Sequence, residues 1–273
     1  MGRTIAHVWT SAPSYLFLTA PAVLRRRLAG RRGERLERLG KYLVLALDGG
    51  SQLALHLGMT GQLFGAGAAS PRLLSATARA ALLPEEQRGF VPDSHTHLHL
   101  SFRDDRPDVY LRDVRKFGKV LLLDPGQSSP RLDRLGVDAL ALAGEDLFRA
   151  GRRRQIAIKS LLLDQSVVAG IGNIYADEAL FLARVRPTRR AGRVTRLECD
   201  AIADSLRQVM LRSIETGGSS ISDYVAPDGR DGSYQNERRV YARSGEPCPG
   251  CRRPIVKRTI GQRSAHYCPG CQR

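Results

Sequence analysis

Four cysteines in the last 26 residues constrain this chain more than any other feature. They form two Cys-Pro-Gly-Cys pairs with the spacing C-x2-C-x16-C-x2-C, at Cys248, Cys251, Cys268 and Cys271. Each pair can turn two thiolates towards one ion, as in a tetrahedral zinc site. Redox-active dithiol pairs are the alternative, but two such pairs without a nearby β-α-β pattern fit thioredoxin chemistry poorly. Four sulfur ligands leave no position for water, so the sequence predicts one structural Zn²⁺ ion.

The segment between the two cysteine pairs predicts a β-hairpin that the metal would hold rigid. Its tip residues, Gln262 and Arg263, would then project at a fixed place. An exposed arginine on a loop is usually only solvated, so the tip needs independent support as a binding site. The fifth cysteine, Cys199, lies in a helical pattern and is expected to be an ordinary packing residue.

The charge balance narrows the class of partner. The chain of 273 residues is long enough for two modest domains, and it carries 43 Lys and Arg against 27 Asp and Glu, a net charge of +16. This excess points to a polyanion, either nucleic acid or an anionic membrane. The early apolar stretch "SAPSYLFLTAPAVL" is too short to span a bilayer and contains prolines, and the first residues do not resemble a signal peptide. We therefore expect a cytoplasmic protein that binds nucleic acid and not a membrane.

Residues 1–125 are predicted to form an antiparallel β-sandwich. The segment "KYLVLALDGGSQLALHLG" has two apolar runs around Asp-Gly-Gly, which is typical of a β-hairpin. In "HTHLHLSFRDDRPDVYLRDV", Leu98, Leu100 and Phe102 alternate with polar residues before a turn, which predicts a second hairpin. Residues 65–94 are rich in Gly, Ala, Ser and Pro and suggest a surface excursion with one short helix at "ATARAALL".

The apolar period becomes helical from about residue 145 to residue 216. Thr195 and Glu198 form a capping box, which predicts a helix of about twenty residues that ends before Gly217. Two shorter helices are expected at "IAIKSLLLD" and "IYADEALFLA". Residues 217–245 then form a loop that leads to the cysteine hairpin.

A glycine-containing turn, "QSVVAGIGN", separates the two shorter helices. Gly170 and Gly172 permit a tight turn, and Asn173 is placed to cap the second helix. A helix start presented in this way offers free amides to a phosphate, although most asparagine caps have no other role.

Five features occur in order along the chain: "GKYLVLAL…LHLGMTGQL", "RDVRKFG", "LLLDQSVVAGIGNIYADEALF", "GGSSISDY" and the cysteine hairpin. With them the chain resembles the formamidopyrimidine-DNA glycosylase family, which includes endonuclease VIII. The resemblance runs from residue 2 to residue 273 and is interrupted chiefly at residues 65–94. The segment "GGSSISDY" is more similar to the branch that acts on oxidised purines.

The resemblance implies a multi-domain α+β fold. An antiparallel β-sandwich would occupy residues 1–125, a helix-two-turn-helix domain with a lesion loop residues 126–239, and a four-cysteine zinc β-hairpin residues 240–273. The implied activity is base-excision repair by one bifunctional enzyme. As a DNA glycosylase it would remove 8-oxoguanine and formamidopyrimidine from duplex DNA, and as an AP lyase it would cut the strand, both conditional on an N-terminal proline. The implied partner is double-stranded DNA with oxidised bases or abasic sites, bound in a cleft by a monomer associated with the bacterial nucleoid.

Three residues match the side chains that fill the gap left by an extruded nucleotide in the family: Met59, Arg115 and Phe117. A thioether and an aromatic ring can wedge between bases, and a guanidinium can hydrogen-bond the orphaned base. Without the family motifs around them, Met59 and Phe117 would be interpreted as core residues. Their exposure therefore tests the resemblance.

The resemblance also assigns DNA contacts to His95, Arg154, Lys159, Asn173 and Arg263. For Arg154 the alternative is a solvated helix start in "RRR". His95, His97 and His99 alternate on one strand and could suggest a metal, but no Cys or carboxylate partner has suitable spacing. We therefore expect no second metal site there.

Catalytic roles are implied for Lys41 and Arg263. Lys41 matches the family's catalytic lysine, although a lysine at the start of a strand is ordinarily a surface charge. Arg263 matches a residue that assists the final elimination step, which would explain why a metal-stiffened hairpin carries it.

The start of the chain departs from the family pattern. Members begin Pro-Glu-Leu-Pro-Glu after the initiator Met, and the proline amine attacks the sugar C1′ while the glutamate transfers protons. This chain begins "MGRTIAHVW", which resembles the segment after that first helix. Three interpretations remain open: a natural start upstream of residue 1, which we favour; a catalytically silent binder of damaged or abasic DNA; and a general zinc-ribbon nucleic-acid-binding protein.

Overall fold

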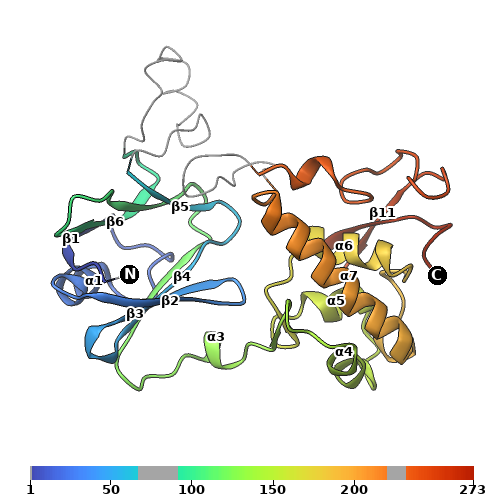
Figure 1. Cartoon of the computed structure of the whole chain (residues 1–273), viewed down its shortest axis with the longest axis horizontal. Coiled ribbons are helices and arrows are strands. Elements are labelled where there is room, and N and C mark those ends of the chain that lie inside the picture. The colour runs from blue at the N-terminus through green and yellow to red at the C-terminus, as the bar shows by residue number, and fades with distance from the viewer. Residues whose placement is uncertain (1, 67–91, 220–231) are drawn as a thin grey trace, which may run out of the picture. The chain divides into compact units, whose positions relative to one another are not determined.

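The computed structural model describes residues 2–66, 92–219 and 232–273 (Figure 1). The chain divides into two compact units, residues 1–129 with 217–235 and residues 130–216 with 236–273. The helix expected at "ATARAALL" lies outside the described residues, as do most of the excursion at 65–94 and part of "GGSSISDY". Within the described ranges no helix is both long and apolar enough to cross a membrane.

The first sheet of the N-terminal unit contains the first expected hairpin. Its strands are β2 (Gly33–Leu39), β3 (Tyr42–Leu47), β4 (Gln52–His56) and β8 (Lys119–Leu123), in the order β2-β3-β4-β8. All neighbours are antiparallel. The turn between β3 and β4 places Gly49 and Gly50 at positive φ values of 74° and 81°, which explains why glycines stand there.

The second sheet contains the second expected hairpin. Its strands are β1 (Ile5–Thr10), β6 (Thr96–Phe102), β7 (Val109–Asp113) and β5 (Gly61–Gly65), in the order β1-β6-β7-β5 and again antiparallel. One core is built from both sheets; its buried residues include Leu47, Leu53, Leu55, Leu98, Leu100 and Leu111. The predicted antiparallel β-sandwich is therefore confirmed.

One helix of this unit was not expected. Helix α1 (Pro21–Leu28) follows β1, and its Leu24 and Leu28 are buried in the sandwich core. Proline is well suited to the first turn of a helix because its fixed φ is helical and the amide it lacks would have no partner there. The prolines of "SAPSYLFLTAPAVL" thus precede and begin a helix.

The C-terminal unit is mainly helical, as expected. Its elements are α3 (Pro130–Asp133), β9 (Val137–Asp138), α4 (Gly144–Gly151), α5 (Ile158–Leu163), β10 (Val168–Ala169), α6 (Asn173–Leu182) and α7 (Arg196–Glu215). The long helix α7 begins with the predicted capping box of Thr195 and Glu198. Cys199 packs in the core of this unit, and burial raises the pKa of its thiol to about 11, which confirms a packing role.

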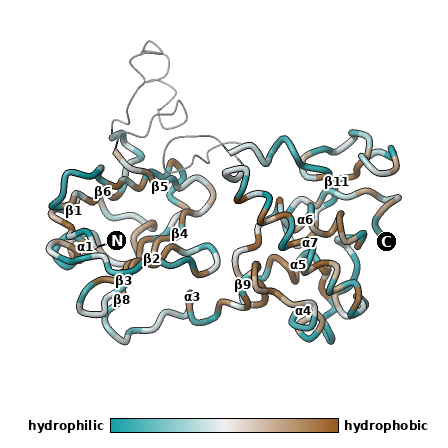
Figure 2. Tube along the Cα trace, viewed as in Figure 1, coloured by the Kyte–Doolittle hydropathy of each residue, from teal (hydrophilic) through white to brown (hydrophobic). Residues whose placement is uncertain are grey.

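The chain ends in the predicted hairpin of β11 (Val256–Ile260) and β12 (Arg263–Tyr267). Gly261 and Gln262 connect the strands at φ values of 53° and 63°, which are typical of a type I′ turn. Figure 2 shows hydrophobic residues concentrated along β4 in the first unit and α5 in the second. The expected α+β fold, with a β-sandwich, a helical domain and a cysteine hairpin, is confirmed.

Candidate metal centre and nucleic-acid interface

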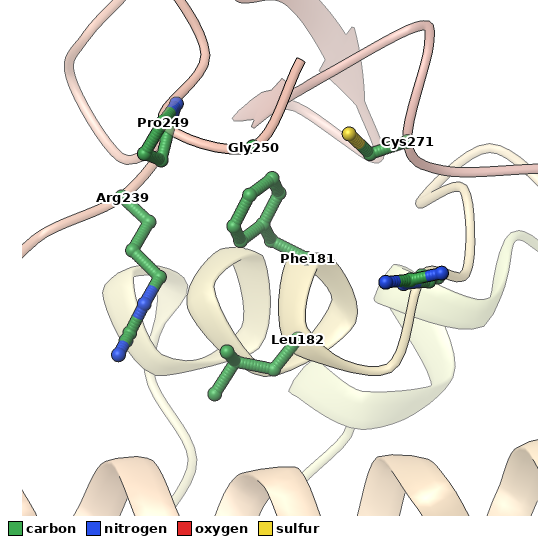
Figure 3. Close-up of a pocket in the computed structure, with 7 residues that line it drawn as sticks. Phe181, Leu182, Arg239, Pro249, Gly250 and Cys271 are labelled. Carbon is green, nitrogen blue, oxygen red and sulfur yellow. The ribbon is translucent and has the colours of Figure 1, made fainter.

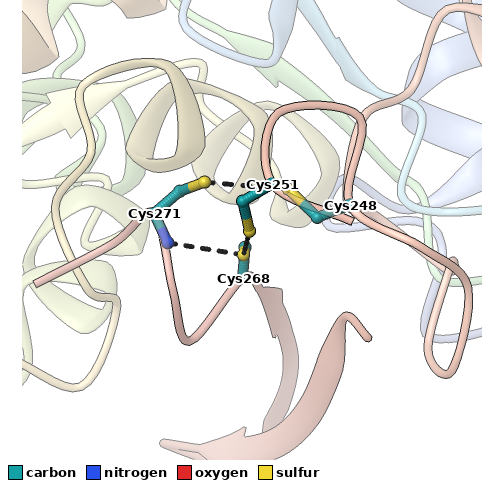
Figure 4. A group of neighbouring side chains, drawn as sticks. All are labelled: Cys248, Cys251, Cys268 and Cys271. Carbon is teal, nitrogen blue, oxygen red and sulfur yellow. Dashed lines mark hydrogen bonds between the residues drawn. The ribbon is translucent and has the colours of Figure 1, made fainter. Parts of the chain in front are cut away.

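The four predicted metal ligands converge at the base of the terminal hairpin (Figure 4). Their Sγ atoms all lie within 4.8 Å of one another. The Sγ atoms of Cys248 and Cys271 are 3.8 Å apart and those of Cys251 and Cys268 are 3.3 Å apart. Ligands about 2.3 Å from one tetrahedral zinc lie about 3.8 Å from each other, so the four thiolates fit the metal. They hold one structural zinc ion.

The metal site has four sulfur ligands and no position for water, as expected of a structural centre. Backbone amides of Gly250 and Cys271 donate to the Sγ atoms of Cys248 and Cys268, both at 3.4 Å. Such bonds stabilise negatively charged sulfur and orient the ligands. Among the described residues these cysteines form the one candidate metal cluster, and His95, His97 and His99 do not converge on another.

Helix α6 docks the metal hairpin through two neighbouring buried carboxylates. The Oδ2 atom of Asp177 accepts the backbone amide of His266 at 2.9 Å, on β12. Glu178 accepts three consecutive backbone amides, of Arg239, Val240 and Tyr241, at 2.8 to 2.9 Å. Asp177 therefore holds a strand of the hairpin, and Glu178 holds the loop before its first cysteine pair.

Lys159 requires a correction. Its side chain has no exposed surface, and its Nζ atom donates to the Asp177 carboxylate and to the carbonyl of Ser264, both at 2.5 Å. Burial lowers the pKa of the Lys159 amine, and the Asp177 charge opposes that shift. An ammonium group inside the protein is not available to a phosphate, so Lys159 supports the hairpin instead of the expected DNA contact.

Asn173 is also placed differently from the prediction. Gly172 is the capping residue of α6, without a side-chain cap, and Asn173 is the first helical residue. Its Nδ2 atom donates to Ser264 Oγ at 3.3 Å, next to Arg263 on the hairpin. Its Oδ1 atom is buried and has no hydrogen-bond partner among the described residues. Asn173 thus joins the start of α6 to the hairpin tip.

The two remaining predicted contacts of this unit are exposed. Arg263 is the first residue of β12 and follows the tip turn directly. Arg154 lies before α5 and forms an exposed ion pair with Asp164 at 3.3 Å. That pair is compatible with either a solvated arginine or a phosphate contact, so the role of Arg154 stays a prediction.

A pocket lies at the other end of the hairpin, beside the first cysteine pair (Figure 3). Phe181 and Leu182 from α6 form one wall, and Pro249 and Gly250 form another. Arg263 lies five residues before Cys268, the first cysteine of the second pair. Five residues of an extended strand span about 16 Å. None of the predicted contact residues in the described ranges lines this pocket.

In the N-terminal unit, strand register brings Lys41, Met59 and Phe117 to one end of a sheet. Tyr42 pairs with His56, and His56 pairs with Lys119. Lys41 precedes the first of these residues, Met59 follows the second by three positions, and Phe117 precedes the third by two. Because neighbouring strands are about 4.8 Å apart, the three candidate residues lie together at one end of these strands, which forms an edge of the sandwich.

Met59 and Phe117 lie on two of the connections that pass from one sheet to the other. Met59 lies between β4 and β5, and Phe117 lies between β7 and β8. Met59 is 55% exposed and Phe117 is 42% exposed, so neither is a core residue. The Arg115 guanidinium stacks over the Phe117 ring at 4.4 Å. The three expected gap-filling residues are therefore accessible at this edge, and the core interpretation is wrong.

The three histidines at and just before β6 play different roles. His95 is partly exposed, and its carbonyl accepts the amide of Asp113 at 2.9 Å, so it lies beside the connection that carries Arg115. His97 is buried between Ser11 Oγ and the Asp113 carbonyl, each at 3.0 Å. His99 contacts Asp108 at 2.8 Å. His95 is thus partly exposed beside this connection, whereas His97 contacts it from inside the protein.

Three buried acids that shape these sites were not predicted from the sequence: Asp113, Asp177 and Glu178. In the sequence, each of these acids lies beside apolar residues, in "YLRDV" and "YADEALF", and this pattern could have indicated their burial. A buried carboxylate needs hydrogen-bond donors, so such positions indicate a loop that closes over them.

Three family models match the chain. The formamidopyrimidine-DNA glycosylase N-terminal domain matches residues 1–120, the H2TH domain of the same family residues 135–225, and the zinc finger found in FPG and IleRS residues 245–273. Among curated relatives, the formamidopyrimidine-DNA glycosylase of Teredinibacter turnerae is 40% identical over 88% of this chain and 81% of its own length. The Thermus thermophilus enzyme of that name is 36% identical over 95% and 87%.

Solved structures agree with this match. The MutM (Fpg) protein of Thermus thermophilus superposes with a TM-score of 0.81 at 36% identity, covering 100% of this chain and 92% of that chain. A Lactococcus lactis Fpg bound to DNA with an abasic site gives a TM-score of 0.82 at 29% identity, covering 100% and 93%.

Proposed function

Because the chain belongs to the formamidopyrimidine-DNA glycosylase family, we propose that it excises oxidised purines from duplex DNA. The substrates are 8-oxoguanine and formamidopyrimidine lesions, and the process is base-excision repair. As a bifunctional DNA glycosylase and AP lyase, it cuts the strand after the base has left. A related Lactococcus lactis Fpg has been crystallised with an abasic site and with a substituted formamidopyrimidine in DNA, which supports this substrate class.

The observation that carries the proposal is the exposure of Met59, Arg115 and Phe117 at one edge of the sandwich. An enzyme that acts on a base inside a duplex must extrude the nucleotide, which costs about a few kcal/mol of unstacking. Apolar side chains that enter the vacated space recover part of that energy. Large exposed apolar groups that lie together beside a stacked guanidinium are suited to this task.

The terminal hairpin supplies the second part of the proposal. Zinc fixes its base, α6 fixes its flank, and Arg263 projects beside the Gly261-Gln262 turn. A guanidinium held in this way can bind two oxygens of one phosphate. We therefore assign Arg263 and Asn173 to the DNA backbone near the extruded nucleotide, and Arg263 also to the final elimination.

The glycosylase step needs an amine nucleophile. Resemblance to the family assigns it to an N-terminal proline amine, which forms a bond to C1′ as the bond to the base breaks. Lys41 is exposed just before β3, and the resemblance matches it with the family's catalytic lysine. An ordinary lysine, with a pKa of about 10.4, is mostly protonated at neutral pH and is a poor nucleophile. We therefore assign Lys41 to stabilising charge and not to the attack.

We propose further that the protein acts as a monomer on DNA in the bacterial cytoplasm, associated with the nucleoid. The net charge of +16 supports a lasting attraction to DNA.

Borohydride trapping tests the activity. The natively expressed protein, with its N-terminus established by intact mass, is incubated with duplexes that contain 8-oxoguanine, an abasic site or no lesion. We expect a covalent adduct with the two damaged duplexes and none with the undamaged one. Selective binding of damaged DNA without an adduct would instead indicate a catalytically silent binder. Equal affinity for all three duplexes at fixed salt would contradict the proposal and leave a general nucleic-acid-binding protein.

A further inference from the structure

Asp113 ends strand β7 and has no exposed surface. It stands where the chain leaves one sheet of the sandwich for the other. A buried carboxylate is costly unless hydrogen bonds satisfy its charge. The donors that satisfy the Asp113 carboxylate come from two connections between the sheets, β4–β5 and β7–β8.

The carboxylate of Asp113 binds the two gap-filling loops at the same time. From the loop of Met59, Thr60 Oγ1 donates to Oδ1. From the loop of Phe117, the backbone amide of Arg115 donates to Oδ1 at 3.3 Å and that of Gly118 to Oδ2 at 2.7 Å. The backbone amide of Arg115 also points to Thr60 Oγ1 at 3.4 Å, so the two loops share one acceptor network.

Backbone packing ties the loops together as well. A Cβ atom added at Gly58 would lie 2.8 Å from the backbone nitrogen of Gly118, closer than real contacts allow. One added at Gly118 would lie 3.0 Å from Asp113 Oδ2. The loops therefore touch backbone to backbone around the carboxylate.

A third contact fixes Arg115 from outside. The hydroxyl of Tyr15 donates to the Arg115 carbonyl at 2.6 Å, and the Lys119 ammonium lies 5.2 Å from the Tyr15 ring. Lys116, between the two gap-filling residues of this loop, has a φ of 56°, which is unusual for a lysine. A backbone held in such a conformation needs surrounding contacts that maintain it.

We propose that Asp113 is a positioning residue that fixes Met59, Arg115 and Phe117 as one preformed wedge before DNA is bound. The inference rests on the proposed function and deepens it. A wedge that is already ordered loses little conformational entropy when it enters the space left by the nucleotide. Because Asp113 has no exposed surface, it acts through the loops and not by direct contact with DNA.

Asp113→Asn is the direct test because it preserves shape and replaces one acceptor oxygen with an NH₂ group. Turned one way, the new NH₂ group faces the backbone amide of Gly118; turned the other way, it faces the backbone amide of Arg115 and forces the Thr60 hydroxyl to accept instead of donate. Asp104→Asn is the control: Asp104 accepts from a backbone amide, as Asp113 does, and from two guanidinium groups, but it lies in the turn before β7, at the other end of that strand.

The readout is the fluorescence of 2-aminopurine opposite a tetrahydrofuran abasic analogue, which rises when the wedge unstacks it. We expect wild type and Asp104→Asn to show the rise, and Asp113→Asn to need about tenfold more protein for it, as loss of a charge-assisted hydrogen bond implies. Affinity for undamaged duplex should remain unchanged. An equal rise at equal concentration in folded Asp113→Asn would overturn the inference.

Thr60→Val decides the matter if Asp113→Asn does not fold, because it removes only the hydroxyl that links Met59's loop to Asp113. The expected result is the same selective loss of the fluorescence rise, and wild-type behaviour would overturn the inference. Wild type that shows no rise on the abasic duplex would instead contradict the proposed function. Circular dichroism and bound zinc check that each variant is folded.

Discussion

At the scale of single residues, the proposed role of Arg263 in DNA binding depends on the rigidity of the terminal hairpin that carries it. Its strand is fixed at one end by the metal cluster and along its length by Asp177. Replacing Arg263 with alanine should weaken binding to every duplex and lower the slope of log K against log salt by about one phosphate contact.

The control for Arg263→Ala is Arg258→Ala, because Arg258 is exposed on the neighbouring strand of the same hairpin. Filter binding at several salt concentrations measures both slopes. A slope for Arg263→Ala equal to that of the control would remove Arg263 from the interface.

His97 makes the stability of the sandwich depend on pH. Burial lowers the pKa of its imidazole below the ordinary value of 6.5, since the ring lies inside against Ser11 and the Asp113 carbonyl. The unfolded chain therefore takes up a proton that the folded protein resists. The contribution of His97 to the free energy of unfolding should be fully present above pH 6.5. It should decrease as the pH is lowered below 6.5, by at most about 1.4 kcal/mol per pH unit.

Urea denaturation between pH 5 and pH 8 measures the contribution of His97 (the range spans its ordinary pKa of about 6.5). The variant His97→Gln should flatten the dependence, and His7→Gln, at an exposed position of β1, should not. Identical slopes for the wild type and His97→Gln would contradict this origin of the effect.

Sequence motifs found the residues that face outwards more reliably than those that face inwards. Met59, Arg115, Phe117 and Arg263 are exposed as the motifs required. Lys159 was interpreted as a surface contact, because nothing local shows that a carboxylate 18 residues later and a carbonyl 105 residues later enclose it. Long-range partners of this kind are a property of the fold and not of the neighbouring sequence.

At the scale of elements, α6 is the helix that joins the helical domain to the metal hairpin. The buried pair of Lys159 and Asp177 and the three amides on Glu178 make this connection. Lys159→Met should lower the free energy of unfolding by about 3 kcal/mol, because it leaves a buried carboxylate without its cation.

The control for Lys159→Met is Lys257→Met, at an exposed position on β11, where a change within about 0.5 kcal/mol is expected. Denaturant titration compares the two. Equal costs for both variants would show that the buried pair contributes nothing to stability.

Removing the metal should release the hairpin. Loss of Cys199, which packs in the helical core, should not affect metal binding. Cys268→Ser should lose bound zinc, lower the thermal midpoint and weaken binding to abasic DNA, since four thiolates close the site. Cys199→Ala should keep one zinc per chain, because Cys199 packs in α7. Metal analysis together with thermal melting checks both, and full zinc content in Cys268→Ser would contradict the assigned ligand set.

Elements with strong local signals were predicted correctly. The Asp-Gly-Gly turn identified β3 and β4, and the capping box identified α7. Helix α1 was missed because eight residues beginning at a proline carry little periodicity, and Asn173 was misjudged as a cap by one position. Short elements depend on what they pack against.

At the scale of the whole molecule, the charge of +16 supplies affinity for any DNA, and the wedge must supply selectivity for a damaged site. The charge follows from the amino-acid composition, and the ordered motifs indicate the family. The bracing of two loops by Asp113 could not be predicted from the sequence, because it depends on strand order in two sheets. Selectivity is therefore the property that depends most directly on the fold.

The ratio of dissociation constants for intact and abasic duplexes at one salt concentration tests the central claim most directly. Wild type should prefer the abasic duplex, and the double variant Met59→Ala, Phe117→Ala should lose that preference while its affinity for intact duplex stays the same. An unchanged ratio in the double variant would contradict the claim that these exposed side chains replace an extruded nucleotide.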